Sequence, residues 1–312
     1  MNGPSGMHRR TRPVRHLARH LVGHLAGHLA VGLLTAITRM PLVLTRSIGT
    51  FLLPAYLPFR RRTRAKLARH CPGVSPFRYY RTRLHLALLS ARHIRNRPDG
   101  CRHVAENATL LTEALAQGRP VVLLGWHQGP VELLHRIPAM HLDRIGKRTG
   151  VKRGLSLLTA SAFSAPLADW MTSGREAGRT APTRVIRPGD MLALRSWARS
   201  RGVLAVMVDQ VPGTPEDTLV PGPGLPALPW PRRLLDWIGT QDPVFLAVTA
   251  RWHPAHAHGL DRIVFRYHAL TADAPSPVGL KVAIGHLMQA ALRAAPEQYN
   301  WSYGKIGTAE TS

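Results

Sequence analysis

The sequence predicts an α/β fold in which a mixed, mostly parallel sheet is flanked by helices. Strands buried on both faces of a parallel sheet read as continuous apolar runs, and three such runs occupy residues 121–124, 203–208 and 244–249. The segments around them read as helices. With 312 residues, 45% of them hydrophobic, the chain can bury a sizeable core in one large domain with an appendage.

The chain before residue 60 is expected to associate with a membrane surface. Residues 1–20 form a basic arm, and residues 21–38 contain no Lys, Arg, Asp or Glu but are at the short end for a membrane span. A second apolar piece, residues 47–59, is interrupted by prolines. Basic residues flank both sides, so the positive-inside rule does not orient a single crossing. We therefore expect residues 21–59 to form a re-entrant hairpin or interfacial helices on the cytoplasmic leaflet.

The net charge indicates which classes of partner to expect, and the cysteine content indicates the redox environment. Lys and Arg number 42 against 17 acids, a net charge of +25 and a pI near 11.6, which favours nucleic acid, anionic lipid or an acidic protein as partner. Cys71 and Cys101 match no metal spacing and make no disulfide framework, which indicates a reducing, cytoplasm-facing location. Four histidines, without an acidic or thiol ligand beside them, indicate the polar edge of an interfacial helix and no metal site; they are His16, His20, His24 and His28.

Helices are predicted before the first apolar run. Residues 63–97 read as two helical stretches divided by the Cys-Pro-Gly sequence at 71–73. Residues 101–117 read as a further helix, and Gly118 supplies a left-handed stop. The central strand follows directly.

The turn after the central strand holds the first candidate catalytic residue. The strand should end near Gly125, and Pro130 suits the first turn of a helix that runs from Val131 and is stopped or bent near Pro138. His127 then sits in a strand-to-helix turn, where open α/β sheets place their chemistry.

Glu132 is predicted to act with His127. It lies five residues on, in the first helical turn, where its carboxylate can point back toward the imidazole. A carboxylate on one ring nitrogen fixes the tautomer and raises the basicity of the other nitrogen, as a general base requires. Backbone N–H groups at the helix start near Gly129 are expected to stabilise an oxyanion.

The elements after this helix are predicted from local signals. Residues 154–172 are expected to be helical, and residues 173–184 to form a loop rich in Gly, Thr and Arg. Asp190 is expected to cap a helix that ends at Gly202.

After the second apolar run, Asp209 and Gln210 follow the carboxyl end of the predicted strand. Taken alone, this pair indicates only a simple turn, because Asp and Gly are common turn formers. The remaining predicted elements are a Pro/Gly-rich loop at 212–232, a short helix at 233–238, a strand at 262–268 that could lie at the edge, and a last helix at 277–295.

These segments together resemble a known family. The sequence GWHQGPVELL is similar to the first motif of the lysophospholipid acyltransferase superfamily, and within it to the bacterial late acyltransferases of lipid A biosynthesis. A His, a Gly two residues on and an acid five residues on recur there, the HX4E pattern, and here they are His127, Gly129 and Glu132. Pro130 and Val131 depart from the residues common in that branch, so the chain resembles a divergent member.

Further positions carry the resemblance across residues 60–301. Asp209, Gln210 and Gly213 resemble the Asp-Gln-x-x-Gly segment that shapes the acceptor site, and PEQYNW at 296–301 resembles the carboxyl-terminal signature of the lipid A branch. Arg251 follows the third apolar run, as in the family. The Phe-Phe-Gly sequence of the lipid A enzymes is absent, with Gly222 or Gly224 in place of its Gly. The basic residue near the charged group of acceptor or donor is aligned with Arg175, with Arg179 and Arg184 as close rivals.

The resemblance implies an acyltransferase domain at 60–312, glycerolipid-acyltransferase-like in fold, on the cytoplasmic face of the inner membrane. His127, oriented by Glu132, would deprotonate a hydroxyl or amine of a lipid or glycolipid acceptor, which attacks an acyl thioester. The donor would be acyl carrier protein or coenzyme A. Neither a GxSxG elbow nor a persuasive catalytic Cys is present in the sequence, so an acyl-enzyme is not expected. The proposed chemistry calls for no cofactor.

Two other classes of function stay open. A catalytically inactive homologue would bind lipid through the same anchor and sheet. A basic nucleic-acid-binding protein would explain the charge, but the sequence has no zinc spacing or groove-reading motif and only 6% aromatic residues, so no nucleic acid is expected as partner.

Overall fold

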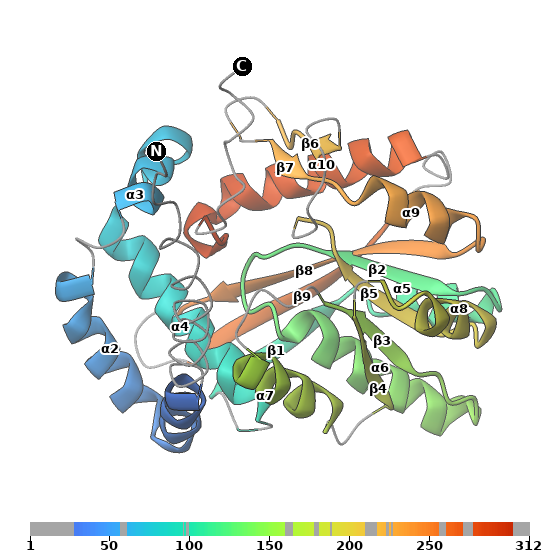
Figure 1. The fold of residues 1–312 in the computed structure, drawn as a ribbon, viewed down its shortest axis with the longest axis horizontal. Helices are drawn as coiled ribbons and strands as arrows, with labels where there is room; N and C mark the ends of the chain where they lie inside the picture. Colours follow the sequence, from blue (N-terminus) through green and yellow to red (C-terminus); the bar gives the residue numbers. More distant parts are fainter. Residues whose placement is uncertain are drawn as a thin grey trace, which may run out of the picture.

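The chain folds around a seven-stranded, mostly parallel mixed sheet with helices on both faces, as shown by a computed structural model (Figure 1). The structure describes residues 28–56, 61–95, 97, 100–159, 165–177, 181–187, 189–209, 217–222, 225, 227–255, 260–270 and 277–301. The predicted basic arm, residues 1–20, and the histidines at 16, 20 and 24 lie outside this part of the chain.

The predicted central strand does lie in the middle of the sheet. Neighbouring strands are parallel except for one antiparallel pair, β8 and β9. In spatial order the strands are β1 (Cys101–Glu106), β9 (Asp261–Ala269), β8 (Val244–His253), β2 (Val121–Gly125), β5 (Val203–Met207), β3 (Leu155–Leu158) and β4 (Thr183–Ile186). A separate two-stranded hairpin is formed by β6 (Thr218–Leu219) and β7 (Leu228–Pro229).

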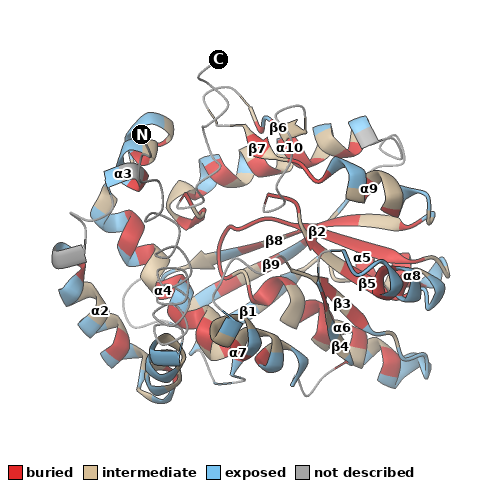
Figure 2. Ribbon diagram, in the orientation of Figure 1, coloured by how far each residue is buried: buried red, intermediate tan, exposed pale blue. Residues whose placement is uncertain are grey.

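Two hydrophobic cores lie on opposite faces of the sheet, because successive side chains of a strand point to opposite sides. Val121 and Leu123 of β2 pack into one core, and Val122 and Leu124 into the other. Buried residues accordingly lie along the sheet strands and on the helices that cover them (Figure 2). The first core is closed by α4 (Pro76–Ile94), α5 (Thr109–Ala116) and α6 (Leu133–Thr149). The second is closed by α8 (Met191–Arg199), α9 (Arg232–Gly239) and α10 (Pro277–Ala294).

Several predicted elements are confirmed. The strands at 121–125 and 203–207 form as expected, as do the helix α3 (Arg61–His70), α4 and α9. The side chain of Asp190 caps α8 by accepting a hydrogen bond from the Ala193 N–H at 2.9 Å. These elements carry their signals locally, in apolar runs, caps and Gly or Pro breaks.

The predictions for two helical segments are wrong in part. Residues 101–106 form β1, and only Thr109–Ala116 is helical; β1 pairs in register with β9, so its stability comes from a distant strand. Residues 155–158 form β3, which lies between β4 and β5, and the helix α7 (Ala165–Glu176) occupies part of the predicted loop.

Helix α6 and the far strands also differ from expectation. α6 continues through Pro138 and ends at Gly150, which has a φ of 73°. Buried side chains on both sides of Pro138 hold this helix together despite the missing N–H. β8 extends to His253, so Arg251 lies inside a strand, and β9 is an interior strand because β1 forms the edge.

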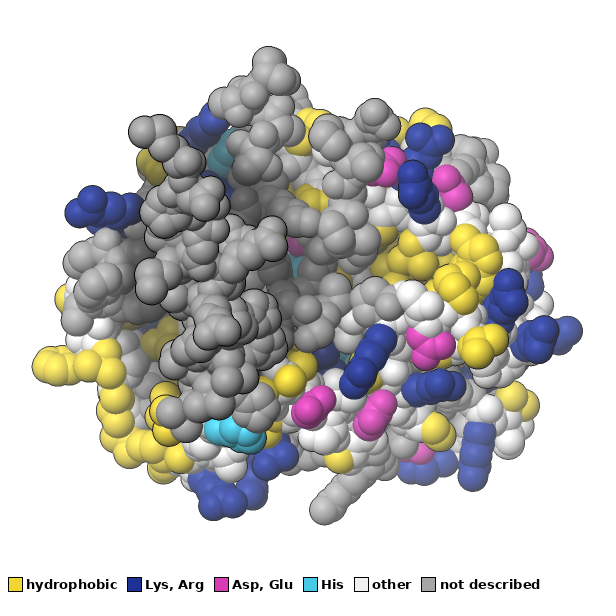
Figure 3. Space-filling model, in the orientation of Figure 1, with side chains coloured by type: hydrophobic (Ala, Val, Ile, Leu, Met, Phe, Trp, Pro, Cys, Tyr) yellow, Lys and Arg dark blue, Asp and Glu magenta, His cyan; other side chains and the backbone are white. Residues whose placement is uncertain are grey.

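Two amino-terminal helices lie outside the sheet layers. Residues 28–39 are helical, and α2 (Leu42–Tyr56) packs along α4. α2 turns large apolar side chains outward: Phe51 is 85% exposed and Val43 74% exposed, and Leu44, Ile48 and Leu52 are exposed beside them. Hydrophobic side chains accordingly line the rim of the molecule over α2 (Figure 3). In the described part of the chain, no helix combines the length and apolar character needed to cross a membrane.

Candidate active site

The turn after β2 presents its residues alternately to two cavities on opposite faces of the sheet. His127 and Gly129 line the cavity beside α4, α6 and α7, and Trp126 and Gln128 line the other. The Trp126 indole N–H donates to the Gln128 side-chain oxygen at 3.0 Å, and the Gln128 amide donates to the carbonyl of Ala291 at 2.7 Å. These bonds fix the turn to α10 and hold the His127 side chain on the opposite side.

Asp209 is the carboxylate that engages the imidazole of His127. It follows β5, which is parallel to β2, so the carboxyl ends of the two strands meet. Its Oδ1 lies 2.8 Å from His127 Nδ1, and its Oδ2 accepts the His127 backbone N–H at 2.9 Å. The Tyr299 hydroxyl also donates to Oδ2, at 3.1 Å. With the Asp209 side chain fully buried, this arrangement places the proton on Nδ1 and the lone pair on Nε2.

The carboxyl-terminal PEQYNW sequence holds the same turn in place. It begins with a short 3₁₀ helix, η2 (Pro296–Gln298). The Asn300 N–H donates to the carbonyl of His127 at 2.9 Å, and Gln128 and Tyr299 form an isolated β-bridge. Tyr299 is therefore a positioning residue whose role sequence analysis missed, although the motif that contains it was found.

Gly129 fits tightly against strand β8. Its φ is +68°, and a Cβ at this position would lie 2.0 Å from the carbonyl oxygen of Ala250. Its N–H donates to the carbonyl of Gln298 at 3.1 Å. This N–H is therefore already bonded within the fold, so the expectation that N–H groups at this helix start stabilise an oxyanion does not hold for the N–H of Gly129.

We expect Gly129→Ala to lower the free energy of unfolding by at least about 2 kcal/mol, because it combines a left-handed backbone with a steric clash. Chemical denaturation would measure the loss. Gly118→Ala is the matched control: Gly118 has a φ of +69°, but its nearest neighbour is an Arg201 side-chain nitrogen at 3.8 Å. Equal losses in the two variants would show that the contact with Ala250 is unimportant.

Glu132 takes part in a different ion cluster from the one predicted. The Arg175 guanidinium donates to both carboxylate oxygens, from Nη2 to Oε1 at 2.6 Å and from Nε to Oε2 at 3.0 Å. His135, one helical turn on, lies 3.0 Å from Oε2 through its Nε2. The assignment of Glu132 as the group that orients His127 is therefore corrected to Asp209. Arg175, expected near a substrate charge, is held in this pair and is only 13% exposed.

The pKa of Glu132 lies well below its ordinary value. Burial alone would raise it, but Arg175 and then His135 lower it by more. Glu132 is thus an anion throughout the neutral range. Its position at the start of α6 joins that helix to α7, which carries Arg175.

Two adjoining cavities meet at this cluster. One, of about 330 Å³, is lined by His127, Glu132 and Arg175 together with an apolar wall; that wall includes Leu86, Leu134, Leu157, Trp170, Met171 and Met207. The other, of about 840 Å³, shares Glu132, His135 and Arg175 with the first and is strongly basic; its further cations are Arg39, Arg95, Arg97 and Arg136. The site therefore joins an apolar compartment that contains His127 to a cationic one.

The remaining predicted site residues are not brought together here. Gln210, Gly213, Gly224 and Arg179 lie outside the described residues. Arg184 is exposed on β4, at the edge of the sheet. Gly222 packs against the side chain of Gln289 on α10. Arg251 lines the cavity on the opposite face of the sheet from His127.

The described part of the site contains no candidate metal centre, and comparison with known proteins assigns no role to its residues. Within the described ranges, no three His, Cys, Asp or Glu side chains gather in a group able to hold a metal ion. No protein-family model matches the chain, and no curated protein matches it at a significant level.

Proposed function

We propose that this chain is an acyltransferase that moves a fatty acyl group from a thioester donor to a hydroxyl or amine of a lipid or glycolipid acceptor. The observation that carries the proposal is the His127–Asp209 pair, with Nδ1 and Oδ1 2.8 Å apart, at the wall of an apolar cavity. The HX4E motif and the PEQYNW sequence, which resemble those of lipid A biosynthesis acyltransferases, support it.

The proposed mechanism uses His127 as general base. Its Nε2 accepts the proton of the acceptor hydroxyl as the oxygen attacks the thioester carbonyl, and Asp209 stabilises the imidazolium that forms. The tetrahedral intermediate then breaks its carbon–sulfur bond, and the departing thiolate takes the proton from Nε2. The products are the acylated acceptor and a free thiol. Burial and the nearby Glu297 raise the pKa of Cys71 to about 11, which argues against a thiolate nucleophile at that residue.

The two adjoining cavities suggest how an amphiphile is held. The compartment of about 330 Å³ has the size and apolar lining of a small-ligand pocket and suits the acyl chain. The basic compartment suits a phosphorylated headgroup, because several guanidinium groups can bind phosphate oxygens in pairs. Under this proposal Glu132 and Arg175 form the partition between chain and headgroup.

The direct test combines the full chain with acyl-acyl carrier protein or acyl-coenzyme A as donor. A phosphorylated lysolipid and a phosphorylated glycolipid serve as acceptors. We expect free thiol and acylated lipid to appear in equal amounts, with both substrates required, as measured by thiol titration and lipid mass spectrometry. Lipid binding without thiol release in every combination would contradict the proposal and favour a catalytically inactive lipid-binding homologue.

We further propose that α2 attaches the protein to the cytoplasmic face of an anionic membrane. Its exposed apolar side chains and the surplus of Arg support this. Removing two large apolar contacts with Val43→Asp and Phe51→Asp should weaken binding to anionic vesicles at least about tenfold in sedimentation, since each buried side chain contributes about 1.5–3 kcal/mol.

Leu192→Asp is the matched control, because Leu192 is 79% exposed on α8, which lies at the opposite end of the molecule from α2 (Figure 1). It should bind vesicles like the unmodified chain. Equal sedimentation of the α2 double variant and the control would place the attachment elsewhere.

A further inference from the structure

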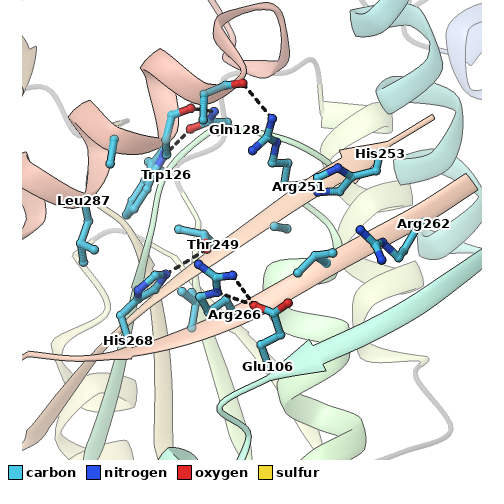
Figure 4. A pocket seen from close by; sticks show the side chains of 16 residues that line it. Glu106, Trp126, Gln128, Thr249, Arg251, His253, Arg262, Arg266, His268 and Leu287 are labelled. Atoms are coloured by element: carbon cyan, nitrogen blue, oxygen red, sulfur yellow. Dashed lines mark hydrogen bonds and ion pairs between the residues drawn. The ribbon is translucent and has the colours of Figure 1, made fainter. Parts of the chain in front are cut away.

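A second cavity lies on the face of the sheet opposite His127. Figure 4 shows its lining, which comes from β8, β9, the end of β1 and one side of α10. It has a volume of about 400 Å³ and opens to solvent. It also touches the catalytic turn, through Trp126 and Gln128. The proposed acyl transfer makes no use of this cavity.

One wall of the cavity is apolar. α10 contributes Leu287 and three alanines, at positions 290, 291 and 294, and Val264 of β9 lies on the sheet side. The alanines leave space between α10 and the sheet where larger side chains would fill it. This wall suits a short hydrocarbon chain.

On the sheet side of the cavity, basic side chains of neighbouring strands lie directly opposite one another. Arg262 of β9 lies opposite Arg102 of β1 and opposite His253 of β8. Residues paired in this way have their side chains on the same face, and like charges directly opposite one another are destabilising. The next row brings Arg251 beside Val264.

The described residues leave these charges without a compensating acid. Glu106 is the one acid among the described residues that line the cavity, and it is engaged by Arg266 (Figure 4). Arg251 donates to a backbone carbonyl, that of Ala294, at 2.8 Å. Arg251 and Arg262, which are both exposed, therefore place two positive charges in the lining of an apolar-walled cavity.

The pKa of His253 depends on the positive charge of these two arginines. The pKa of His253 is lowered by burial, then by Arg251 and Arg262, and raised only in part by Glu106. A dianion seated between the two arginines would reverse this balance and raise the pKa of His253.

We propose that this cavity binds a phosphate monoester that carries a short apolar chain. Arg251 and Arg262 bind the phosphate oxygens, and the α10 wall formed by Leu287, Ala290 and Ala294 holds the chain. A phosphate monoester fits because its charge of nearly −2 matches the two arginines and its oxygens suit guanidinium pairs. This binding is separate from acyl transfer and does not depend on it.

The experiment uses the full chain and three probes: hexyl phosphate, inorganic phosphate and hexanol. Calorimetry should show that hexyl phosphate binds at least about tenfold more tightly than either of the other two. Nuclear magnetic resonance titration should show the pKa of His253 rising when hexyl phosphate is bound.

Two variants separate charge from shape. Arg262→Ala should weaken hexyl phosphate binding by about tenfold or more, as expected for loss of a charge-assisted contact. Ala290→Phe, at an exposed position on α10, should fill the apolar wall and reduce hexyl phosphate to the affinity of inorganic phosphate. Arg195→Ala, at an exposed position on α8, is the matched control. It should change neither the affinity for hexyl phosphate nor the affinity for inorganic phosphate.

Three results would overturn the proposal. Equal affinity for hexyl phosphate and inorganic phosphate would indicate an adventitious anion only. Unchanged binding in both Arg262→Ala and Ala290→Phe would place the ligand elsewhere. Binding without any rise in the pKa of His253 would exclude a phosphate between the two arginines.

Discussion

His127→Ala is expected to lower the rate of acyl transfer by about 10²–10⁴-fold while leaving the protein folded. The lost contribution is that of a positioned general base, which is commonly of this size. The side chain is 10% exposed at a cavity wall, and the turn is held by backbone bonds to Gln298 and Asn300 that do not involve the imidazole. The rate is measured as thiol release, and folding by thermal unfolding.

Asp209→Asn tests how the imidazole is positioned. The amide lacks the charge that stabilises an imidazolium and does not enforce the same tautomer, so a loss of kcat within the range of about 10²–10⁴-fold is expected, no larger than that of His127→Ala, because Asp209 acts through the imidazole. Tyr299→Phe removes one bond to the same carboxylate and should cost much less. His286→Ala, at an exposed position on α10, is the control. Activity near that of the unmodified chain in His127→Ala would refute the mechanism.

The parts of the fold that could be predicted from sequence are those with local signals. β2 and β5 are apolar runs with β-branched residues, and Asp190 caps a helix by a bond three residues away. β1 and β3 were missed because their residues are fixed by pairing with strands distant in the chain. A short run such as 155–158 has no period that separates a strand from a helix.

The candidate site divides in the same way. His127 could be predicted because a strand, a turn and a proline place it locally. Its partner could not, because the sequence favours the acid five residues away, whereas Asp209 is 82 residues away and arrives through the β2–β5 pairing. Tyr299 lies 90 residues beyond Asp209, so only the fold brings the three side chains together.

Glu132→Ala is expected to destabilise the protein by about 3–5 kcal/mol, a larger structural effect than any proposed for His127. The substitution leaves the Arg175 guanidinium, which is 13% exposed, without the carboxylate that engages it twice. Removing one partner of a buried ion pair typically costs this much, because the remaining charge stays desolvated. Glu132→Gln keeps the shape and should still lose most of the stability, as measured by urea unfolding.

The stability lost on replacing Glu132 should be greatest at neutral pH and should decrease in acid. The pKa of Glu132 in the folded protein lies below its ordinary value of 4.5, so the carboxylate contributes its full stabilisation above pH 4.5. That stabilisation decreases as the pH falls below 4.5 toward the folded-state pKa. The unmodified chain and Glu132→Gln should therefore differ most at neutral pH and converge in acid.

A double-variant cycle distinguishes the stability contributed by the Glu132–Arg175 ion pair from the stability that Glu132 contributes at the start of α6. Arg175→Met alone leaves a buried carboxylate whose remaining ion-pair partner, among the described residues, is His135, and it should also destabilise the protein. Combining Arg175→Met with Glu132→Leu removes both charges and should recover most of the loss, because apolar replacement of a buried pair is often neutral. Additive losses in the double variant would show that the two side chains act independently. Stability would then have to come from the separate packing of α6 and α7, and the partition proposed between the two cavities would have no electrostatic basis.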